Sequence, residues 1–274
     1  MMANSGLSPS KESLPASSDA AEPLYTAPAL EKGLDILELL AGEAEGLSQG
    51  AIAAKLGRSA TELFRMLSVL ERRGYLNRHA DGSYRLSLRL FELAHQHPPL
   101  KRLLTVALPA MQDLAQATRQ SAHLVVHFAR RILIVAQVDS PEPMGFGVRL
   151  GANFPFLPDR ASARVLSAFQ PLPIQEELIA ELIVNSACPV SATKLRGVLS
   201  EIVRTGFYLA ESVTTAGITD LCAPVFDHTD GAVAALTVPY VKQRDVRVTV
   251  AAARESLLVA TRGISAKLGQ RSVG

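Results

Sequence analysis

The chain has 274 residues, of which 48% are hydrophobic and 20% charged, and its formal net charge is only +2. A chain of this length can bury two modest hydrophobic cores, so we expect a small domain and a larger one. No stretch approaches the roughly 20 uncharged apolar residues of a membrane span. Cys188 and Cys222 are too few for a disulfide framework. These features exclude a membrane-spanning protein and a disulfide scaffold, and they indicate a protein of the reducing cytoplasm.

Composition and turn residues divide the chain into four segments. The first 27 residues hold six serines and three prolines without an apolar run of signal-peptide length, which predicts a disordered leader over 1–27. We expect a small domain over 28–86, a linker helix within 87–99, which a Pro-Pro pair ends, and a larger domain over 100–270. The sequence therefore predicts two folded parts joined by a short helix.

Two helices and a tight turn are expected near the start of the small domain. Ser48 can cap a helix over 49–56, and the turn that begins at Gly57 ends it. A second helix, from about 60 to 73, carries leucines at i, i+4 and i+7, which gives it one buried face. This spacing is typical of a helix-turn-helix.

A basic hairpin follows the second helix. Strands over 75–78 and 83–86 are joined by an Asp-Gly turn, so the whole segment indicates a winged helix-turn-helix. Between residues 55 and 89 the sequence holds eight basic residues and three acidic ones. We interpret the segment as a DNA-binding domain, because the basic charge is concentrated where DNA would lie. The alternative is a protein-interaction module, a role that small winged helices also fill.

The expected DNA contacts come from the helix start, the second helix and the wing. Thr61, Glu62 and Arg65 lie on the exposed side of the second helix and are predicted to approach the major groove. The wing side chains are predicted to contact phosphate or the minor groove. The full set of predicted DNA-binding residues is Ser48, Gln49, Arg58, Ser59, Thr61, Glu62, Arg65, Arg78, His79 and Arg85.

The larger domain reads as a mixture of helices and strands. Apolar positions repeat at helical spacing in several segments and alternate in others. We expect its helices over 100–118, 161–169, 191–204 and 244–268, and its strands over 121–128, 131–138, 221–226 and 232–238. Two further helices are expected before it, one over 29–41 that opens the small domain and the linker helix over 88–94. This order predicts an α+β fold for the chain.

Taken together, these motifs resemble the IclR family of bacterial transcriptional regulators. The matching strings are LEKGLDIL at 30–37, LFRML at 63–67, LERRGYL at 70–76, GFY at 206–208, GI at 217–218, APVFD at 223–227 and VAALTV at 233–238. The resemblance implies an N-terminal winged helix-turn-helix and a C-terminal, GAF-like mixed α/β effector-binding domain. It implies a dimeric repressor or activator that binds a small metabolite, often a carboxylate or an aromatic acid.

The resemblance also implies where an effector binds, although the chain departs from the family there. The family's Pro-Leu-His segment is replaced by residues 155–164, which lack the histidine and have Ala163 in place of a glycine. A second hydroxyl position on the last strand is occupied by Pro239. Carried over by the resemblance, the effector-binding residues are Arg160, Glu211, Asp220 and Thr237 through side chains and Ala161 and Ser162 through backbone N–H groups, with Phe156, Leu157 and Leu221 as apolar walls.

The charged side chains of this expected site restrict which ligands it can bind. An anion beside both Glu211 and Asp220 would need compensation from Arg160. We therefore expect a hydroxylated or larger acid rather than a simple keto acid.

Three other motifs have simpler explanations. Residues 145–151 (GFGVRLG) are not followed by the helix that a dinucleotide loop requires. Ser191, in a Ser-x-x-Lys string, is better explained as a helix N-cap. His123 and His127 share one strand face without a third metal ligand, which favours a half-exposed polar face over a zinc site. We expect both cysteines to be ordinary buried thiols.

We therefore expect neither a catalytic residue nor a metal or cofactor, and no enzymatic activity. An enzyme with an adaptor winged helix and a protein-interaction scaffold remain the alternative functions, but no Ser-His-Asp, metal or phosphate motif supports the former. The expected partners are double-stranded operator DNA, a small-molecule effector and a second copy of the chain. Such a homodimer, or a dimer of dimers, would bind an inverted repeat.

Overall fold

The computed structural model describes residues 26–242 and 248–270. The predicted leader over 1–27 falls almost wholly outside these residues, as does the expected start of the last helix at residue 244. The chain forms two compact units, which divide between Leu93 and Ala94, inside the predicted linker. Each unit is described by itself.

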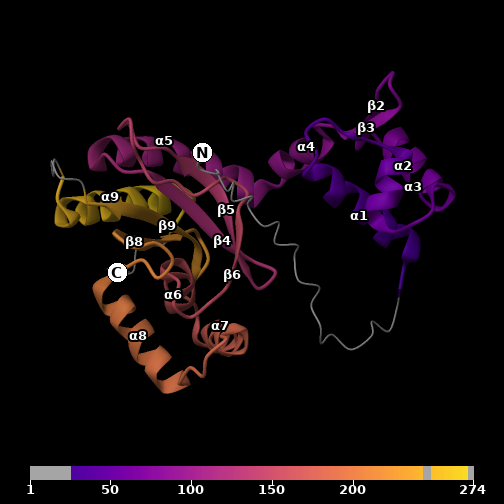
Figure 1. Ribbon diagram of the computed structural model, residues 1–274. Coiled ribbons are helices and arrows are strands. Elements are labelled where there is room, and N and C mark those ends of the chain that lie inside the picture. The colour runs from indigo at the N-terminus through magenta and orange to yellow at the C-terminus, as the bar shows by residue number, and fades with distance from the viewer. Residues whose placement is uncertain (1–25, 243–247, 271–274) are drawn as a thin grey trace, which may run out of the picture. The chain divides into compact units, whose positions relative to one another are not determined.

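The first unit combines helices with a three-stranded sheet (Figure 1). Its elements are α1 (Pro28–Ala41), β1 (Leu47–Ser48), α2 (Gln49–Leu56), α3 (Ala60–Arg72), β2 (Leu76–Arg78), β3 (Ser83–Leu86) and the start of α4 (Arg89–Gln96). The short strand β1, which sequence patterning missed, pairs with β3, so the sheet order is β1-β3-β2. The predicted winged helix-turn-helix is thus formed.

Local residues begin and end the two central helices of this unit. Ser48 caps α2 by accepting a hydrogen bond from the Ala51 amide, and Ser59 caps α3 in the same way through the Glu62 amide. Gly57 ends α2 in the left-handed conformation, with φ of 62°. The leucines of α3 then pack inward, and Leu63 and Leu67 are fully buried.

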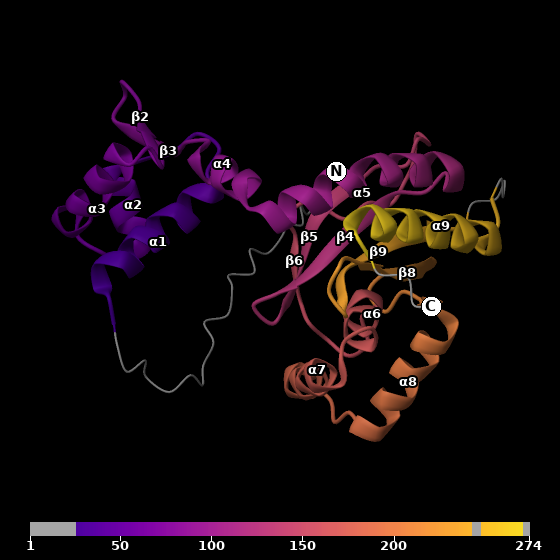
Figure 2. The same cartoon turned by 180° about the vertical axis from the view of Figure 1, so that it is seen from behind.

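The second unit is a six-stranded antiparallel sheet covered by helices on both faces (Figures 1 and 2). Its strands are β4 (Ala122–Phe128), β5 (Arg131–Val138), β6 (Asn153–Pro155), β7 (Tyr208–Glu211), β8 (Ile218–Phe226) and β9 (Ala232–Val241), in the spatial order β6-β5-β4-β9-β8-β7. Its helices are α5 (Pro98–Thr118), α6 (Ala161–Ala168), α7 (Leu172–Asn185), α8 (Ala192–Thr205) and α9 (Val250–Leu268).

Alternation along the strands gives this unit two cores. Leu221 and Leu236 face α5 and α9, whereas Cys222 and Ala235 face α6. Helices α5 and α9 lie side by side over one face, and α6 covers the other, with α7 and α8 packed against it (Figures 1 and 2). The side chains of the α6 face are therefore the ones that a cavity between sheet and helix can use.

The sequence missed three elements of this unit, namely β6, β7 and α7. The two strands are only three and four residues long, too short for a clear alternation. Helix α7 has apolar residues on more than one side, which blurs its helical period. None of the helices in the described parts of the chain is long and apolar enough to cross a membrane.

Candidate functional site

The exposed side of α3 and the wing offer basic side chains in the first unit. Thr61 and Arg65 are exposed on α3, while Arg78 and His79 are exposed on the hairpin. The Arg78 guanidinium lies 5.7 Å from the centre of the Tyr84 ring, which holds its stem against the sheet. Four of the predicted DNA contacts are thus accessible on adjacent elements of one unit.

Two other predicted contacts are engaged by α1. The Glu62 carboxylate lies 2.6 Å from Lys32 Nζ and 3.6 Å from Arg58. Arg58 is also bound to Asp35 at 3.1 Å. The prediction that Glu62 approaches the major groove is not supported, because the ion pair with Lys32 directs its carboxylate toward α1.

The remaining predicted contacts have roles within the domain. Ser48 and Ser59 are helix caps, and the Gln49 amide donates to the Ala60 carbonyl over 2.8 Å. Arg85 lies 3.3 Å from Glu45 and packs over Gly46, where a Cβ atom would meet the Arg85 side chain. These side chains therefore make contacts within the winged helix-turn-helix itself.

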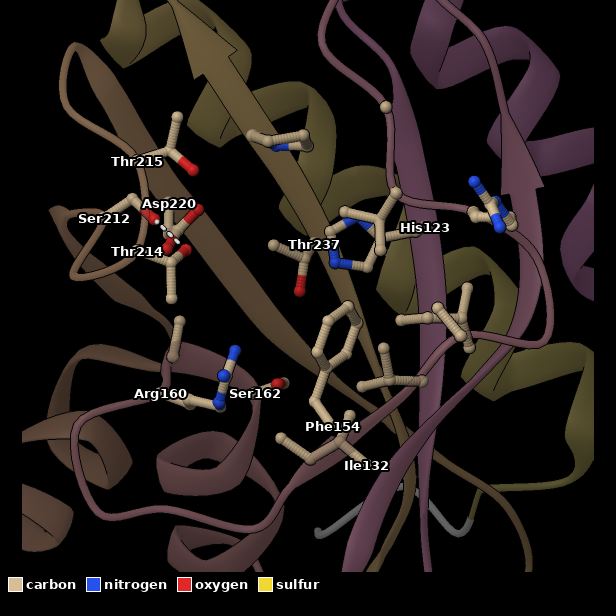
Figure 3. Close-up of a pocket in the computed structure, with 18 of the residues that line it drawn as sticks. His123, Ile132, Phe154, Arg160, Ser162, Ser212, Thr214, Thr215, Asp220 and Thr237 are labelled. Carbon is tan, nitrogen blue, oxygen red and sulfur yellow. Dashed lines mark hydrogen bonds between the residues drawn. The ribbon is translucent and has the colours of Figure 1, made fainter. Parts of the chain in front are cut away.

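A cavity of about 690 Å³ opens on the α6 face of the large sheet (Figure 3). Strands β4, β5, β8 and β9 form its floor, and the start of α6 forms one side. Two loops, 146–152 and 212–215, form the rest of its wall. Five of the six predicted effector residues line it, namely Arg160, Ala161, Ser162, Asp220 and Thr237.

Arg160 and Asp220 form the charged end of the cavity (Figure 3). Arg160 is the N-cap residue of α6, and its guanidinium stacks 5.0 Å from the centre of the Phe154 ring. Its buried Nε has no hydrogen-bond partner among the described residues. Burial lowers the pKa of Arg160, and the carboxylates of Asp159 and Asp220 partly offset this. Burial raises the pKa of Asp220, against a hydrogen bond from Ser212 and the charge of Arg160.

His123 and Thr237 occupy the other end of the floor. They are directly opposed in the β4–β9 pairing, and the Thr237 hydroxyl donates to the Cys222 sulfur over 3.2 Å. His123 is only 9% exposed, so the expected half-exposed face is wrong at this position. Burial lowers its pKa to about 4, which keeps the imidazole neutral at pH 7.

Four predicted site residues lie outside the cavity lining. Glu211 is exposed on the edge strand β7, although the adjacent Ser212 lines the cavity. Phe156 is fully buried in the core under α6, and Leu157 faces a different surface pocket. Leu221 faces α5 and α9, because successive strand residues point to opposite faces and Asp220 takes the cavity side. These four predictions are corrected.

The cavity loops carry the lining residues that the sequence did not predict. Phe146, Val148 and Thr214 approach it from segments without helical or strand periodicity. The glycines of residues 145–151 were the sequence signal that could have indicated this loop. A Cβ atom on Gly147 would lie 3.0 Å from the Gln137 side chain, and one on Gly145 would lie 2.8 Å from the Ser140 side chain. These glycines let the loop pack closely against the sheet.

The other motifs resolve as structural features. Ser191 caps α8 by accepting from the Lys194 amide, as predicted. His127 pairs with Glu181 at 3.0 Å, and the described residues contain no cluster of three metal-ligand side chains. Cys222 is buried, but Cys188 is exposed, which corrects the expectation that both thiols are buried.

Two family models match the chain. The C-terminal domain of the bacterial transcriptional regulator IclR matches residues 100–266, and the IclR helix-turn-helix domain matches residues 29–80. The glycerol operon regulatory protein of Streptomyces griseus is 30% identical over 211 residues, which cover 76% of this chain and 83% of the relative.

Solved structures share the fold. An IclR homolog of Microbacterium hydrocarbonoxydans, crystallised with 4-hydroxybenzoate, has a TM-score of 0.70 and 23% identity, covering 88% of this chain and 98% of that one. The IclR of Thermotoga maritima has a TM-score of 0.69 and 22% identity over 88% of this chain and 99% of its own.

The matches to the helix-turn-helix model and to named regulators, together with the winged helix-turn-helix, identify the chain as a DNA-binding transcriptional regulator. The chain belongs to the IclR family of these regulators.

Proposed function

We propose that the cavity of the larger domain binds a small organic acid, and that this binding changes the affinity of the winged helix for operator DNA. The observation that carries the proposal is the Arg160 guanidinium. Its Nε is buried at the cavity wall and lacks a hydrogen-bond partner within the described chain. Leaving a buried charged donor unpaired is costly, so a ligand anion there would supply what the protein does not.

The helix start beside Arg160 supports an anionic ligand. Ala161 and Ser162 line the cavity from the first turn of α6, where backbone N–H groups lack partners within a helix. These groups and the helix dipole favour negative charge. Because Glu211 does not line the cavity, Asp220 is the one carboxylate of the lining that would repel a bound anion. The charge of Arg160 therefore has to compensate for one carboxylate and not for two.

The centre of the cavity favours an acid with an apolar body. Val125, Ile132, Ile134 and Phe154 line it between the polar ends. A benzoate-sized ring or a short aliphatic chain would replace water on these surfaces. The Microbacterium relative was crystallised with 4-hydroxybenzoate, an acid of this class. Small organic acids, including hydroxylated ones, are accordingly the first ligands to test.

We also propose that the protein acts in the cytoplasm as a homodimer, or a dimer of dimers, on an inverted repeat. One winged helix covers a half-site, so an inverted repeat requires two copies. Leu30 and Leu34 on α1 are 63% and 47% exposed. Leu88, which precedes α4, and Leu90, within it, are 80% and 40% exposed. Burial of such side chains against a second copy would remove apolar surface from water.

Isothermal titration calorimetry with benzoate, 4-hydroxybenzoate, glycerate and a sugar acid tests the ligand proposal. We expect at least one acid to bind the wild type and Arg160→Met to weaken that binding roughly tenfold or more, as for a lost charged hydrogen bond. Arg196→Met, which removes the exposed ion pair between Arg196 on α8 and Glu176 on α7, is the matched control and should bind normally. Equal affinity in Arg160→Met and wild type would refute the proposed anion site.

A further inference from the structure

The cavity contains a second unsatisfied polar group, the imidazole of His123. The side chain is 91% buried, and its Nδ1 has no hydrogen-bond partner in the described part of the chain. The ring projects from β4 into the cavity, beside Thr237 (Figure 3). A polar side chain this deep in a cavity normally has a partner.

Protein groups nearby do not supply that partner. The Thr237 hydroxyl donates its hydrogen to Cys222, and Val125 and Ile132 present only hydrocarbon. Asp220 is turned toward the other end, where it interacts with Ser212 and Arg160. Nδ1 itself is buried, but the ring lines the cavity, so a molecule that enters the cavity meets the part of the imidazole that faces it.

The strand register separates His123 from the charged end. His123 is opposite Thr237 on β9, and Thr237 is opposite Cys222 on β8. Asp220 lies two residues from Cys222 along β8. Strands are about 4.8 Å apart and rise about 3.4 Å per residue, so the Cα atoms of His123 and Asp220 are about 12 Å apart. Because both side chains and Arg160 reach inward, the space between them suits a body of ring size.

The chemistry of a neutral imidazole selects the group that fits it. Since burial holds the pKa of His123 at about 4, the ring carries one donor and one acceptor at pH 7. A hydroxyl can both donate and accept, so it pairs with either tautomer. A second carboxylate could only accept, so it would pair only with the tautomer whose N–H faces it, and it would have to lose its water on entering the cavity.

We propose that His123 is a specificity-determining residue of the cavity, which recognises a hydroxyl on the ligand across an apolar body from the carboxylate bound at Arg160. This inference rests on the proposed acid-binding function and adds to it the position and chemistry of a second anchor. It selects ω-hydroxylated or para-hydroxylated acids over their unsubstituted counterparts.

Calorimetry with matched ligand pairs tests the inference. The pairs are benzoate with 4-hydroxybenzoate and hexanoate with 6-hydroxyhexanoate. For at least one pair we expect the wild type to bind the hydroxylated acid at least tenfold more tightly. His123→Phe, which keeps a ring of similar shape, should lose this preference while still binding the unsubstituted acid. His123→Gln, which keeps a donor and an acceptor, should retain part of the preference for the hydroxylated acid. His127→Phe is the control on the same strand and should behave as the wild type.

The outcomes separate the inference from the proposed function. If acids bind through Arg160 but His123→Phe discriminates between the pair members as the wild type does, the assignment of His123 is overturned while the acid site stands. If no acid of either pair binds the wild type, the second anchor fails; the acid site fails with it only if glycerate and the sugar acid do not bind either.

Nitrogen-15 NMR of labelled histidine gives a readout that loss of folding cannot mimic. The His123 resonance is identified by its absence in His123→Phe. We expect a neutral ring at pH 7 whose nitrogen shifts change on addition of the hydroxylated acid. An equal response to the unsubstituted acid would contradict direct recognition of the hydroxyl.

Discussion

At the scale of single residues, Arg65 is the clearest DNA contact. It is exposed in the middle of α3, on the same side as Thr61, and no ion pair of the described residues holds it within the domain. We predict that Arg65→Ala weakens operator binding by about 1–3 kcal/mol, or roughly fivefold to 150-fold.

Fluorescence anisotropy on operator DNA at several salt concentrations measures this effect. Arg204→Ala, which removes an exposed arginine paired with Glu201 on α8, is the control and should leave operator binding unchanged. A loss confined to low salt would assign Arg65 to phosphate, and no loss at any salt concentration would contradict the contact.

His123 gives a pH prediction with a definite sign. The unfolded chain takes up a proton near the ordinary pKa of 6.5, whereas the folded chain does so only near pH 4. The unfolded state therefore binds more protons between these values, so stability is complete above pH 6.5 and falls as the pH drops toward 4. A shift of this size corresponds to about 3 kcal/mol.

Denaturant unfolding of the whole chain at pH 7 and pH 4 tests this. We expect His123→Phe to lose about 3 kcal/mol less stability than the wild type over that range. Parallel losses in the two proteins would show that His123 is not the group that titrates.

At the scale of elements, the caps of the helix-turn-helix are the strongest sequence signals. Ser48, Gly57 and Ser59 act locally on their own helix ends, so their roles were visible without tertiary information. The two-residue strand β1 and the edge strands β6 and β7 exist only through pairing with distant partners, which no local pattern records.

Some parts of the candidate site could likewise be located from the sequence, whereas others depend on tertiary packing. Arg160 and Asp220 were placed in the candidate site with the help of the family resemblance, and both line the cavity. Glu211, carried over in the same way, is exposed on β7 outside the lining, while the next residue, Ser212, lines the cavity. The loops 146–152 and 212–215, and the burial of His123, depend on how the sheet and α6 close over the cavity, which is a property of packing.

The cap of α3 is open to a direct test. We predict that Ser59→Ala destabilises the helix by about 1 kcal/mol, because the Glu62 amide loses its acceptor. Hydrogen–deuterium exchange over residues 59–72 should accelerate, and operator affinity should fall with it. Ser68→Ala, inside the same helix, is the comparison and should cause neither change. Unaltered exchange in Ser59→Ala would mean that the cap contributes little.

At the scale of the whole molecule, the exposed leucines of α1 bear on assembly. We predict that Leu34→Asp converts a dimer to a monomer at micromolar concentration and removes binding to a two-half-site operator, because a charge would have to be buried at the interface. Sedimentation velocity measures the mass directly. Leu172→Asp places the same charge at a side chain that is 73% exposed on α7 and should remain dimeric. A wild-type protein that sediments as a monomer and protects a single half-site would refute the dimer.

The central claim is that the winged helix and the acid cavity are coupled. Coupling between two sites is commonly about 1–3 kcal/mol, so an acid that binds at Arg160 should change operator affinity roughly fivefold to 150-fold.

The most direct test is an operator titration by fluorescence anisotropy, with and without a saturating acid identified by calorimetry, in the wild type and in Arg160→Met. The account predicts a shift in operator affinity for the wild type and a smaller shift for Arg160→Met at the same acid concentration, with equal operator affinities of the two proteins when the acid is absent. Operator affinity that stays the same in the wild type whether or not the bound acid is present would contradict it.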